Sequence, residues 1–325
     1  MSLSLRNMIR HWAFRWMITL SVWGVLGYRI RQELHQSDHH FALATVDGFY
    51  FGIAIALLPL NYFLETLKWK WLIQPIEPDL GFKDCLKAVL VGASYGLFTP
   101  NRIGEYVGRL GAIQPEKRWQ AGVATFWNRI TQMMVTLWMG MSGFIFLENQ
   151  NITKYYVPLL LGVMLLILIT IGYIAILIQS PRLFNYFRRL KFVQHYHFSR
   201  KLLQGAETLS RRMMSLSLFM AFVRYVVFSV QYALLFFSLG VKDDFFIIYA
   251  LGTQVFLIKS FVPSIALAEL GIREVIAIYV FKQIGISTWI AVQATFALFL
   301  INLLLPAVVG AFFIPDWFKH KRQRS

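Results

Sequence analysis

Two segments of this sequence carry proline, glycine, glutamate and arginine inside otherwise apolar stretches. The first is Tyr95–Arg109 (YGLFTPNRIGEYVGR) and the second is Phe261–Glu274 (FVPSIALAELGIRE). Guanidinium groups bind phosphate oxygens through paired hydrogen bonds, and carboxylates can balance them or bind a cation. Charges and helix breakers at membrane depth are costly, so both segments are candidate sites for an ion or a substrate.

The first segment is predicted to break at Pro100, which lacks an amide hydrogen, with Gly104 as a second hinge residue. A helix that restarts near Arg102 places Glu105 in its first turn and Arg109 four residues later on the same face. We predict that Arg102 and Arg109 bind a phosphate while Glu105 balances them or binds a cationic headgroup. The alternative is a neutralised pair that only allows the segment to lie in the membrane.

The second segment has the same residue types, with Pro263 and Gly271 as hinge residues. Glu269 and Arg273 are four residues apart, so they share one helical face, and Glu274 follows without an obvious local partner. These three residues complete the predicted substrate site. The alternative is that Arg273 pairs with both acids at an interfacial turn.

Polar residues outside the two segments are predicted to have structural roles. Asn128, Arg129 and Arg224 lie in other apolar runs, and single arginines near helix ends extend to lipid headgroups. The run Lys68–Trp71 is typical of an interfacial anchor, in which indole rings lie at headgroup level. We therefore predict no site role for any of them.

No metal or cofactor site is predicted. His35, His39 and His40 with Asp38 fit a short solvated loop, since no further ligand spacing follows. The patterns GxxxxGK[ST], HExxH, GxSxG and GxGxxG do not occur, so the common nucleotide-dependent and hydrolase classes lack support. Asn151–Thr153 matches a glycosylation acceptor, a triplet that is common by chance.

The elements that must position these residues are membrane helices. With 57% hydrophobic and 16% aromatic residues in 325 positions, the chain carries more apolar surface than a soluble core could bury, which predicts an all-α integral membrane protein. The net charge of +16 could indicate nucleic acid, but the bases lie in short segments between apolar runs. We expect membrane lipids, with an anionic or phosphate-bearing headgroup, and no nucleic acid as partners.

Six runs are long enough to cross a hydrocarbon core of about 30 Å: 12–28, 43–64, 120–147, 155–178, 216–239 and 288–314. The connection 179–213 carries eight bases and one acid, so the positive-inside rule places it, and both termini, in the cytoplasm.

The interrupted regions 84–118 and 246–284 are then predicted to be broken or re-entrant hairpins. The first enters and leaves on the cytoplasmic side, and the second leaves and returns on the outer side, either by crossing twice or by turning near the middle. The halves 43–147 and 216–314 would form an inverted repeat with its site at the midplane, within one polytopic membrane domain spanning 1–325.

Four short motifs occur in order across nearly the whole chain: Leu67–Leu72, Gly96–Glu105 with Arg109, Asn128-Arg129, and Pro263 followed by Gly271–Glu274. Together they resemble the flippase-type transmembrane domain of bacterial lysylphosphatidylglycerol synthetase/flippase. The resemblance implies a lipid-translocating domain of a bacterial cytoplasmic (inner) membrane, and its matching positions are Pro100, Arg102, Gly104, Glu105, Arg109, Gly271, Arg273 and Glu274.

Two departures from the family pattern affect what the resemblance implies. No aminoacyl-transferase domain follows, so we expect this chain not to make lysyl lipid itself. The stretch Ile265–Glu269 lacks the glycine that is usual there, which affects the expected shape of the second turn.

The leading hypothesis is a lipid flippase or transporter that moves a phospholipid or a lipid-linked headgroup between leaflets. One alternative is a membrane-embedded lipid-modifying enzyme that uses Glu105 and Glu274 as acid and base. Another is a noncatalytic membrane partner of a separate lipid-synthesising enzyme. Association into a homo-oligomer is also left open.

Overall fold

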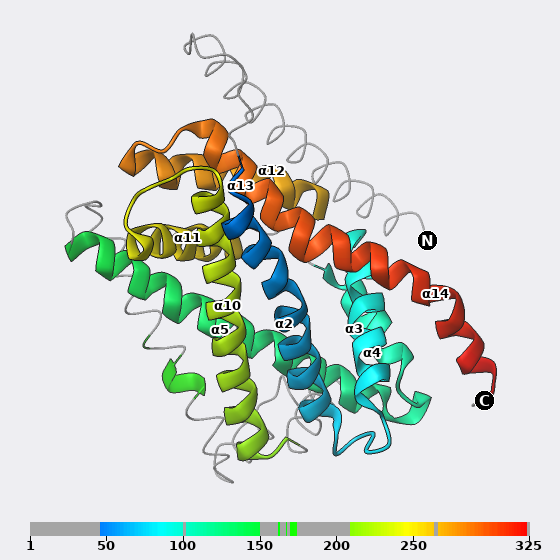
Figure 1. Ribbon diagram of the computed structural model, residues 1–325. Coiled ribbons are helices and arrows are strands. Elements are labelled where there is room, and N and C mark those ends of the chain that lie inside the picture. Colours follow the sequence, from blue (N-terminus) through cyan, green and yellow to red (C-terminus); the bar gives the residue numbers. More distant parts are fainter. Residues whose placement is uncertain are drawn as a thin grey trace, which may run out of the picture.

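The computed structural model describes residues 46–99, 102–149, 162, 167, 170–173, 209–262 and 266–323, and of 266–270 and 315–323 it describes the backbone. This described part is helical, without strands (Figure 1). The predicted span 12–28, nearly all of the span 155–178 and most of the basic connection 179–213 lie outside it. So do the histidine group at 35–40 and the triplet Asn151–Thr153.

Four predicted spans are confirmed as helices long and apolar enough to cross a membrane. They are α2 (Gly48–Ile73), α5 (Arg118–Asn149), α10 (Arg211–Ser238) and the continuous rod of α13 (Thr288–Phe299), η4 (Leu300–Leu304) and α14 (Leu305–Gln323). Polar caps fix where several of them begin: side-chain oxygens of Asp47, Ser210 and Ser287 accept backbone amides of the first turn.

Each interrupted region is a pair of helices around a break. In the first region, α3 (Phe82–Leu97) precedes α4 (Gly104–Gly111), and the short helix η2 (Pro115–Lys117) leads into α5. In the second, α11 (Phe245–Ser260) precedes α12 (Ala266–Phe281) and η3 (Lys282–Ile284). Helices of 16 residues, the longest in each pair, extend about 24 Å, which is less than the hydrocarbon thickness.

The two halves of the described chain are interlocked (Figure 1). At the centre, α2 and α10 pack side by side and run antiparallel: the Asp47 amide donates to the Ser238 carbonyl at one end, and Glu65 meets Arg224 toward the other. Around them, α3 of the first half packs on α14 of the second, and α11 of the second half packs on α5 of the first.

Glycines allow α3 to approach α14 closely and α5 to approach α11 closely. A Cβ atom at Gly310 of α14 would collide with the Leu90 carbonyl of α3, where Ser94 Oγ also donates to the Ala307 carbonyl at 2.5 Å. A Cβ at Gly143 of α5 would likewise collide with the Thr253 hydroxyl of α11. Small residues at helix crossings are typical of membrane proteins, where close van der Waals contact replaces the hydrophobic driving force.

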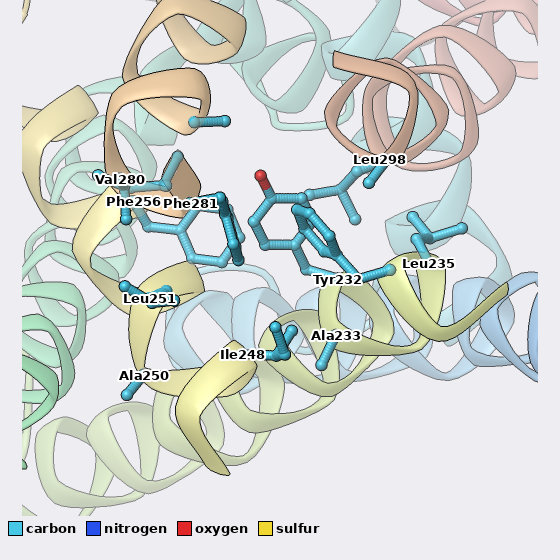
Figure 2. Close-up of a cluster of buried hydrophobic side chains, with 14 of the residues drawn as sticks. Tyr232, Ala233, Leu235, Ile248, Ala250, Leu251, Phe256, Val280, Phe281 and Leu298 are labelled. Carbon is cyan, nitrogen blue, oxygen red and sulfur yellow. The ribbon is translucent and has the colours of Figure 1, made fainter. Parts of the chain in front are cut away.

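The largest apolar core joins the second pair to the central helices. Figure 2 shows Tyr232 of α10 among Phe256, Phe281 and Leu298, which come from α11, α12 and α13. The ring of Tyr232 lies 5.2 Å from that of Phe256 and 5.9 Å from that of Phe281. The Tyr232 hydroxyl and the Thr295 hydroxyl hydrogen-bond at 2.7 Å, so the polar end of this ring is satisfied inside the core.

The first pair is packed through glycine on both helices. Gly92 and Gly96 of α3 face Gly104 and Gly108 of α4, in two matching G-x-x-x-G spacings. A Cβ at Gly108 would collide with the Gly92 backbone, and one at Gly104 with the Tyr95 carbonyl. Gly104 therefore permits close approach of two helices, in addition to any part in the predicted hinge.

Gly108→Ala is expected to lower the free energy of unfolding by about 1–3 kcal/mol, because the new methyl group can be accommodated only by separating α3 from α4. The melting midpoint of the purified protein in detergent measures this. Gly52→Ala is the matched control: its Cβ meets nothing within 4 Å, and this substitution should be neutral or slightly stabilising. Equal melting of both variants would contradict the packing argument.

Candidate functional site

Glu65 of α2 is the centre of a buried ionic group supplied by four helices. Its Oε1 accepts hydrogen bonds from Arg109 Nη2 of α4 at 2.5 Å and from Asn128 Nδ2 of α5 at 2.9 Å. Its Oε2 lies 3.1 Å from Arg224 Nη1 of α10 and 3.8 Å from Lys68 Nζ. One carboxylate thus ties α2, α4, α5 and α10 together.

The local sequence of α2 explains how Glu65 is held. Glu65 and Lys68 are three residues apart and lie on one face, and the buried Lys68 ammonium also donates to the Asn128 carbonyl at 3.0 Å. On the next residue, the indole of Trp69 donates to the Thr125 hydroxyl at 3.0 Å and lies 5.8 Å from the Arg109 guanidinium. The aromatic face and the carboxylate together orient Arg109.

The residues of the first segment meet this group from α4. As predicted, α4 carries Glu105 in its first turn, and Arg109 shares its face, with the two charges 3.8 Å apart. Arg102 Nη1 lies 3.8 Å from the other Glu105 oxygen. Arg102 has φ of 55°, and the nearby Thr99 hydroxyl accepts the Gly104 amide at 2.7 Å. A left-handed arginine is uncommon and often accompanies a functional constraint.

The ion pairs join six side chains, which we call the Glu65 cluster: Glu65, Lys68, Arg102, Glu105, Arg109 and Arg224. The side chains of Glu65, Lys68 and Arg109 are 7%, 0% and 5% exposed, whereas those of Arg102, Glu105 and Arg224 are 28%, 23% and 27% exposed. The cluster therefore has a buried inner part and an outer part that a ligand can reach.

Arg109 has unused hydrogen-bonding capacity. Its Nη2 contacts both carboxylates, while Nε and Nη1 are buried without a hydrogen-bond partner among the described residues. A buried guanidinium donor that makes no hydrogen bond is costly, so these two groups favour an acceptor supplied by a ligand. Phosphate and carboxylate oxygens are acceptors that suit such guanidinium donors.

A chain of amide side chains continues from the cluster between the halves of the protein. Arg224 Nε donates to Asn61 Oδ1 at 2.7 Å, Asn61 Nδ2 donates to Asn302 Oδ1 at 3.1 Å, and Asn302 Nδ2 donates to Gln231 Oε1 at 2.8 Å. Gln231 Nε2 then donates to the Ala54 carbonyl at 2.7 Å. We call Asn61, Asn302 and Gln231 the amide chain. These residues lie within helices that are long and apolar enough to cross a membrane.

The backbone at Asn302 departs from regular α-helical geometry. Asn302 lies in η4, a π-helical turn within the α13–α14 rod, and such turns often occur at functional sites. Pro306, four residues later, has no amide hydrogen to donate to the Asn302 carbonyl in an α-helical bond. The Tyr62 hydroxyl donates to that carbonyl at 3.1 Å instead.

The second segment lies largely on α12, which packs on α11 and α13 and also contacts α3. Arg273 and Glu274 are buried in α12 and interact electrostatically with Tyr232, whose hydroxyl bonds Thr295. Gly271 lies inside α12, which is continuous from Ala266 to Phe281, so the break precedes this glycine. Glu269 is on the same helix, but its side chain is outside the described part, as are the residues Pro100 and Pro263.

Two structural interpretations from the sequence are wrong. Arg224 does not extend to a headgroup: it bonds Glu65, Asn61 and Gln132, the last at 3.1 Å. Asn128 also bonds Glu65. In the predicted anchor Lys68–Trp71, Lys68 and Trp69 are buried inside the protein, because Glu65 and Thr125 supply partners there.

Sequence reasoning missed Glu65 itself and the amide chain. The available signal was an acid at the end of a long apolar run with a lysine three residues later. An ionisable residue in such a run is a candidate site residue by default, and its partner can be far away in sequence. For Asn61, Gln231 and Asn302 the signal was an amide side chain within a predicted span.

Comparison with known proteins gives the family. The model of the lysylphosphatidylglycerol synthase TM region matches residues 16–310, which is most of the chain. A search of curated proteins and a search of solved structures each returned no match. The matched region includes every residue of the Glu65 cluster and the amide chain. The chain is an integral membrane protein, and it belongs to the lysylphosphatidylglycerol synthase TM region family.

Proposed function

We propose that this protein moves a lipid with a phosphate-bearing headgroup between the leaflets of a bacterial cytoplasmic membrane. The observation that carries the proposal is the Glu65 cluster, in which Arg109 presents two buried donors without hydrogen-bond partners among the described residues. The family match supports a membrane role connected with lipids. The transport activity itself is our inference from the site.

Transport of a charged headgroup requires a polar path. Moving a phosphate through hydrocarbon costs many kcal/mol unless hydrogen-bonding groups replace its water. The partly exposed Arg102, Glu105 and Arg224 can receive the headgroup, and Arg109 lies behind them. The amide chain begins at Arg224 and offers further polar groups between α2, α10 and η4.

The arrangement of helices suits alternating exposure of such a site. We propose that α3–α4 and α11–α12 are re-entrant hairpins that enter from opposite membrane faces, with both termini in the cytoplasm. Their longest helices, of 16 residues, are short for a full crossing, and each pair packs on a span of the other half. Rocking of one half against the other would then expose the cluster to each side in turn.

The test is leaflet exchange of labelled lipids in liposomes that contain the purified protein. Glu105→Lys is expected to lower exchange at least about tenfold, because a third cation would displace Arg102 and Arg109, each 3.8 Å from the carboxylate. Lys242→Gln is the control: Lys242 is an exposed residue of the α10–α11 connection and should leave exchange unchanged.

Three results would count against the transport proposal. Full exchange by folded Glu105→Lys protein would exclude the cluster from the transport path. Chemical conversion of the lipid without exchange would favour a lipid-modifying enzyme. Exchange that appears only after a separate synthase is added would favour a partner role.

A further inference from the structure

Tyr62 of α2 connects the Glu65 cluster with the π-helical turn η4. It lies three residues before Glu65, so the two residues share one face of the helix. Its side chain is partly buried, and its hydroxyl donates to the Asn302 carbonyl at 3.1 Å. One side chain therefore reaches from the face that carries the cluster to the backbone of the α13–α14 rod.

The same hydroxyl lies near the residues that are proposed to receive the headgroup. It interacts electrostatically with Arg102, which precedes α4, and with Arg224 of α10. The side chains of these two arginines are 28% and 27% exposed. A phosphate bound by either guanidinium comes near the phenol O–H of Tyr62, a donor that phosphate oxygens can accept.

Tyr62 cannot serve both acceptors at once, because a hydroxyl has a single hydrogen to donate. If the hydroxyl turns to a headgroup, the Asn302 carbonyl loses its bond to Tyr62. Pro306 has no amide hydrogen with which to replace that bond by the one a regular α-helix would make. Donation to a headgroup therefore disfavours the present geometry of η4.

A change at η4 would move the two halves relative to each other. The rod passes from α13, which packs on α10 and α12 of the second half, to α14, which packs on α3 of the first (Figure 1). The close contact of Gly310 with Leu90 and the bond from Ser94 to the Ala307 carbonyl hold α14 to α3. Because α4 packs on α3, a bend at η4 would carry α3 and α4 together.

We infer that the Tyr62 hydroxyl is a ligand of the headgroup phosphate, and that its transfer from the Asn302 carbonyl to a phosphate oxygen couples headgroup binding to bending of the rod at η4. This inference rests on the proposed function. It adds a binding residue to the site and states how binding is linked to the motion of the two halves.

Binding is measured apart from transport, by titrating the purified protein in detergent with short-chain phosphatidylglycerol and following the melting midpoint. Tyr62→Phe should weaken binding about three- to tenfold, because the phosphate loses one donor. Pro306→Ala should tighten binding by about the same factor. An alanine at this position gives the Asn302 carbonyl an amide donor, so the release of the Tyr62 hydroxyl becomes less costly.

The double variant Tyr62→Phe/Pro306→Ala separates this role from a merely structural one. Without ligand, Tyr62→Phe should melt below the wild type, and the added alanine amide should restore much of that loss. Binding by the double variant should nevertheless stay as weak as in Tyr62→Phe. If Tyr62 only holds η4 in place, Pro306→Ala restores binding together with stability, and that result would overturn the inference.

Two controls accompany these titrations. Tyr50→Phe changes another tyrosine of α2, whose ring lies 5.8 Å from that of Phe237, and should bind phosphatidylglycerol like the wild type. Inorganic phosphate, titrated separately, distinguishes a lipid headgroup from a free anion. Half-saturation by inorganic phosphate at a concentration equal to or below that of phosphatidylglycerol would overturn the lipid assignment. Absence of saturable phosphatidylglycerol binding to the wild type would overturn it as well.

Leaflet exchange shows which of the two proposals fails. Pro306→Ala should exchange phosphatidylglycerol more slowly than the wild type despite its tighter binding, because binding no longer favours a change at η4; an unchanged rate would overturn the coupling. The expected binding pattern without exchange by the wild type would overturn transport and leave Tyr62 as a headgroup ligand. Exchange by the wild type, with wild-type binding and exchange by Tyr62→Phe, would overturn this inference and leave transport standing.

Discussion

Glu65→Gln is expected to lower the free energy of unfolding by about 3–5 kcal/mol, since it removes the charge that Arg109, Arg224 and Lys68 share. The amide keeps the shape of the side chain and an acceptor for Asn128, so the loss comes from charge and not from packing. Thermal unfolding in detergent, with the yield of folded protein, measures it. Glu116→Gln, at an exposed acid of η2, should change stability by less than about 0.5 kcal/mol.

A double-mutant cycle identifies the cause of that loss. Arg109→Met alone leaves Glu65 with fewer cations, but Glu65→Gln/Arg109→Met removes both partners of the 2.5 Å contact. The double variant should therefore lose less than the sum of the single variants, with a coupling energy of about 1–3 kcal/mol. Additive losses would mean that the two residues stabilise the protein independently, contrary to the ionic arrangement described.

Asn302→Leu should be the second most destabilising change, at about 2–4 kcal/mol. Leucine fills a similar volume but leaves Asn61 Nδ2 and Gln231 Oε1 without their partner in apolar surroundings, and each orphaned group costs roughly 1–3 kcal/mol. Melting of the variant measures the effect. The double variant Gln231→Leu/Asn302→Leu removes one of the two orphaned groups and should be more stable than Asn302→Leu.

The amide chain also has a functional test that separates structure from transport. If it belongs to the headgroup path, the stabilised double variant Gln231→Leu/Asn302→Leu should still show slow leaflet exchange. If it only holds α2, α10 and η4 together, exchange should recover with stability. If the Asn302→Leu variant melts at the same temperature as the wild type, neither the transport role nor the structural role of the amide chain is supported.

Several features followed directly from local sequence. The long apolar runs predicted four helices of the described chain, because hydrophobic length is a property of consecutive residues. The breaks near 98–103 and 261–265 followed from proline and glycine within those runs. The Glu105–Arg109 contact also followed, since residues four apart on a helix share a face whatever the rest of the fold does.

The partners of those residues could not be obtained in this way. Arg109 meets Glu65, which is 44 residues away, and Arg224 meets Asn61, which is 163 residues away. Such contacts depend on which helices pack together, and that choice is set by distributed features such as the glycine contacts of Gly310 and Gly143. Local patterns predicted that Arg224 and Lys68 lie at the membrane surface. In an isolated helix no partner for a buried charge is visible, so the side chain is expected to extend to the headgroups.

The sequence by itself therefore determined the class of protein, its long helices, its two interrupted segments and part of its candidate site. Only the tertiary structure decided which charges share one carboxylate and that an amide chain joins the two halves. The physical reason is that helix formation in a membrane depends on neighbours in sequence, whereas charge compensation depends on neighbours in space.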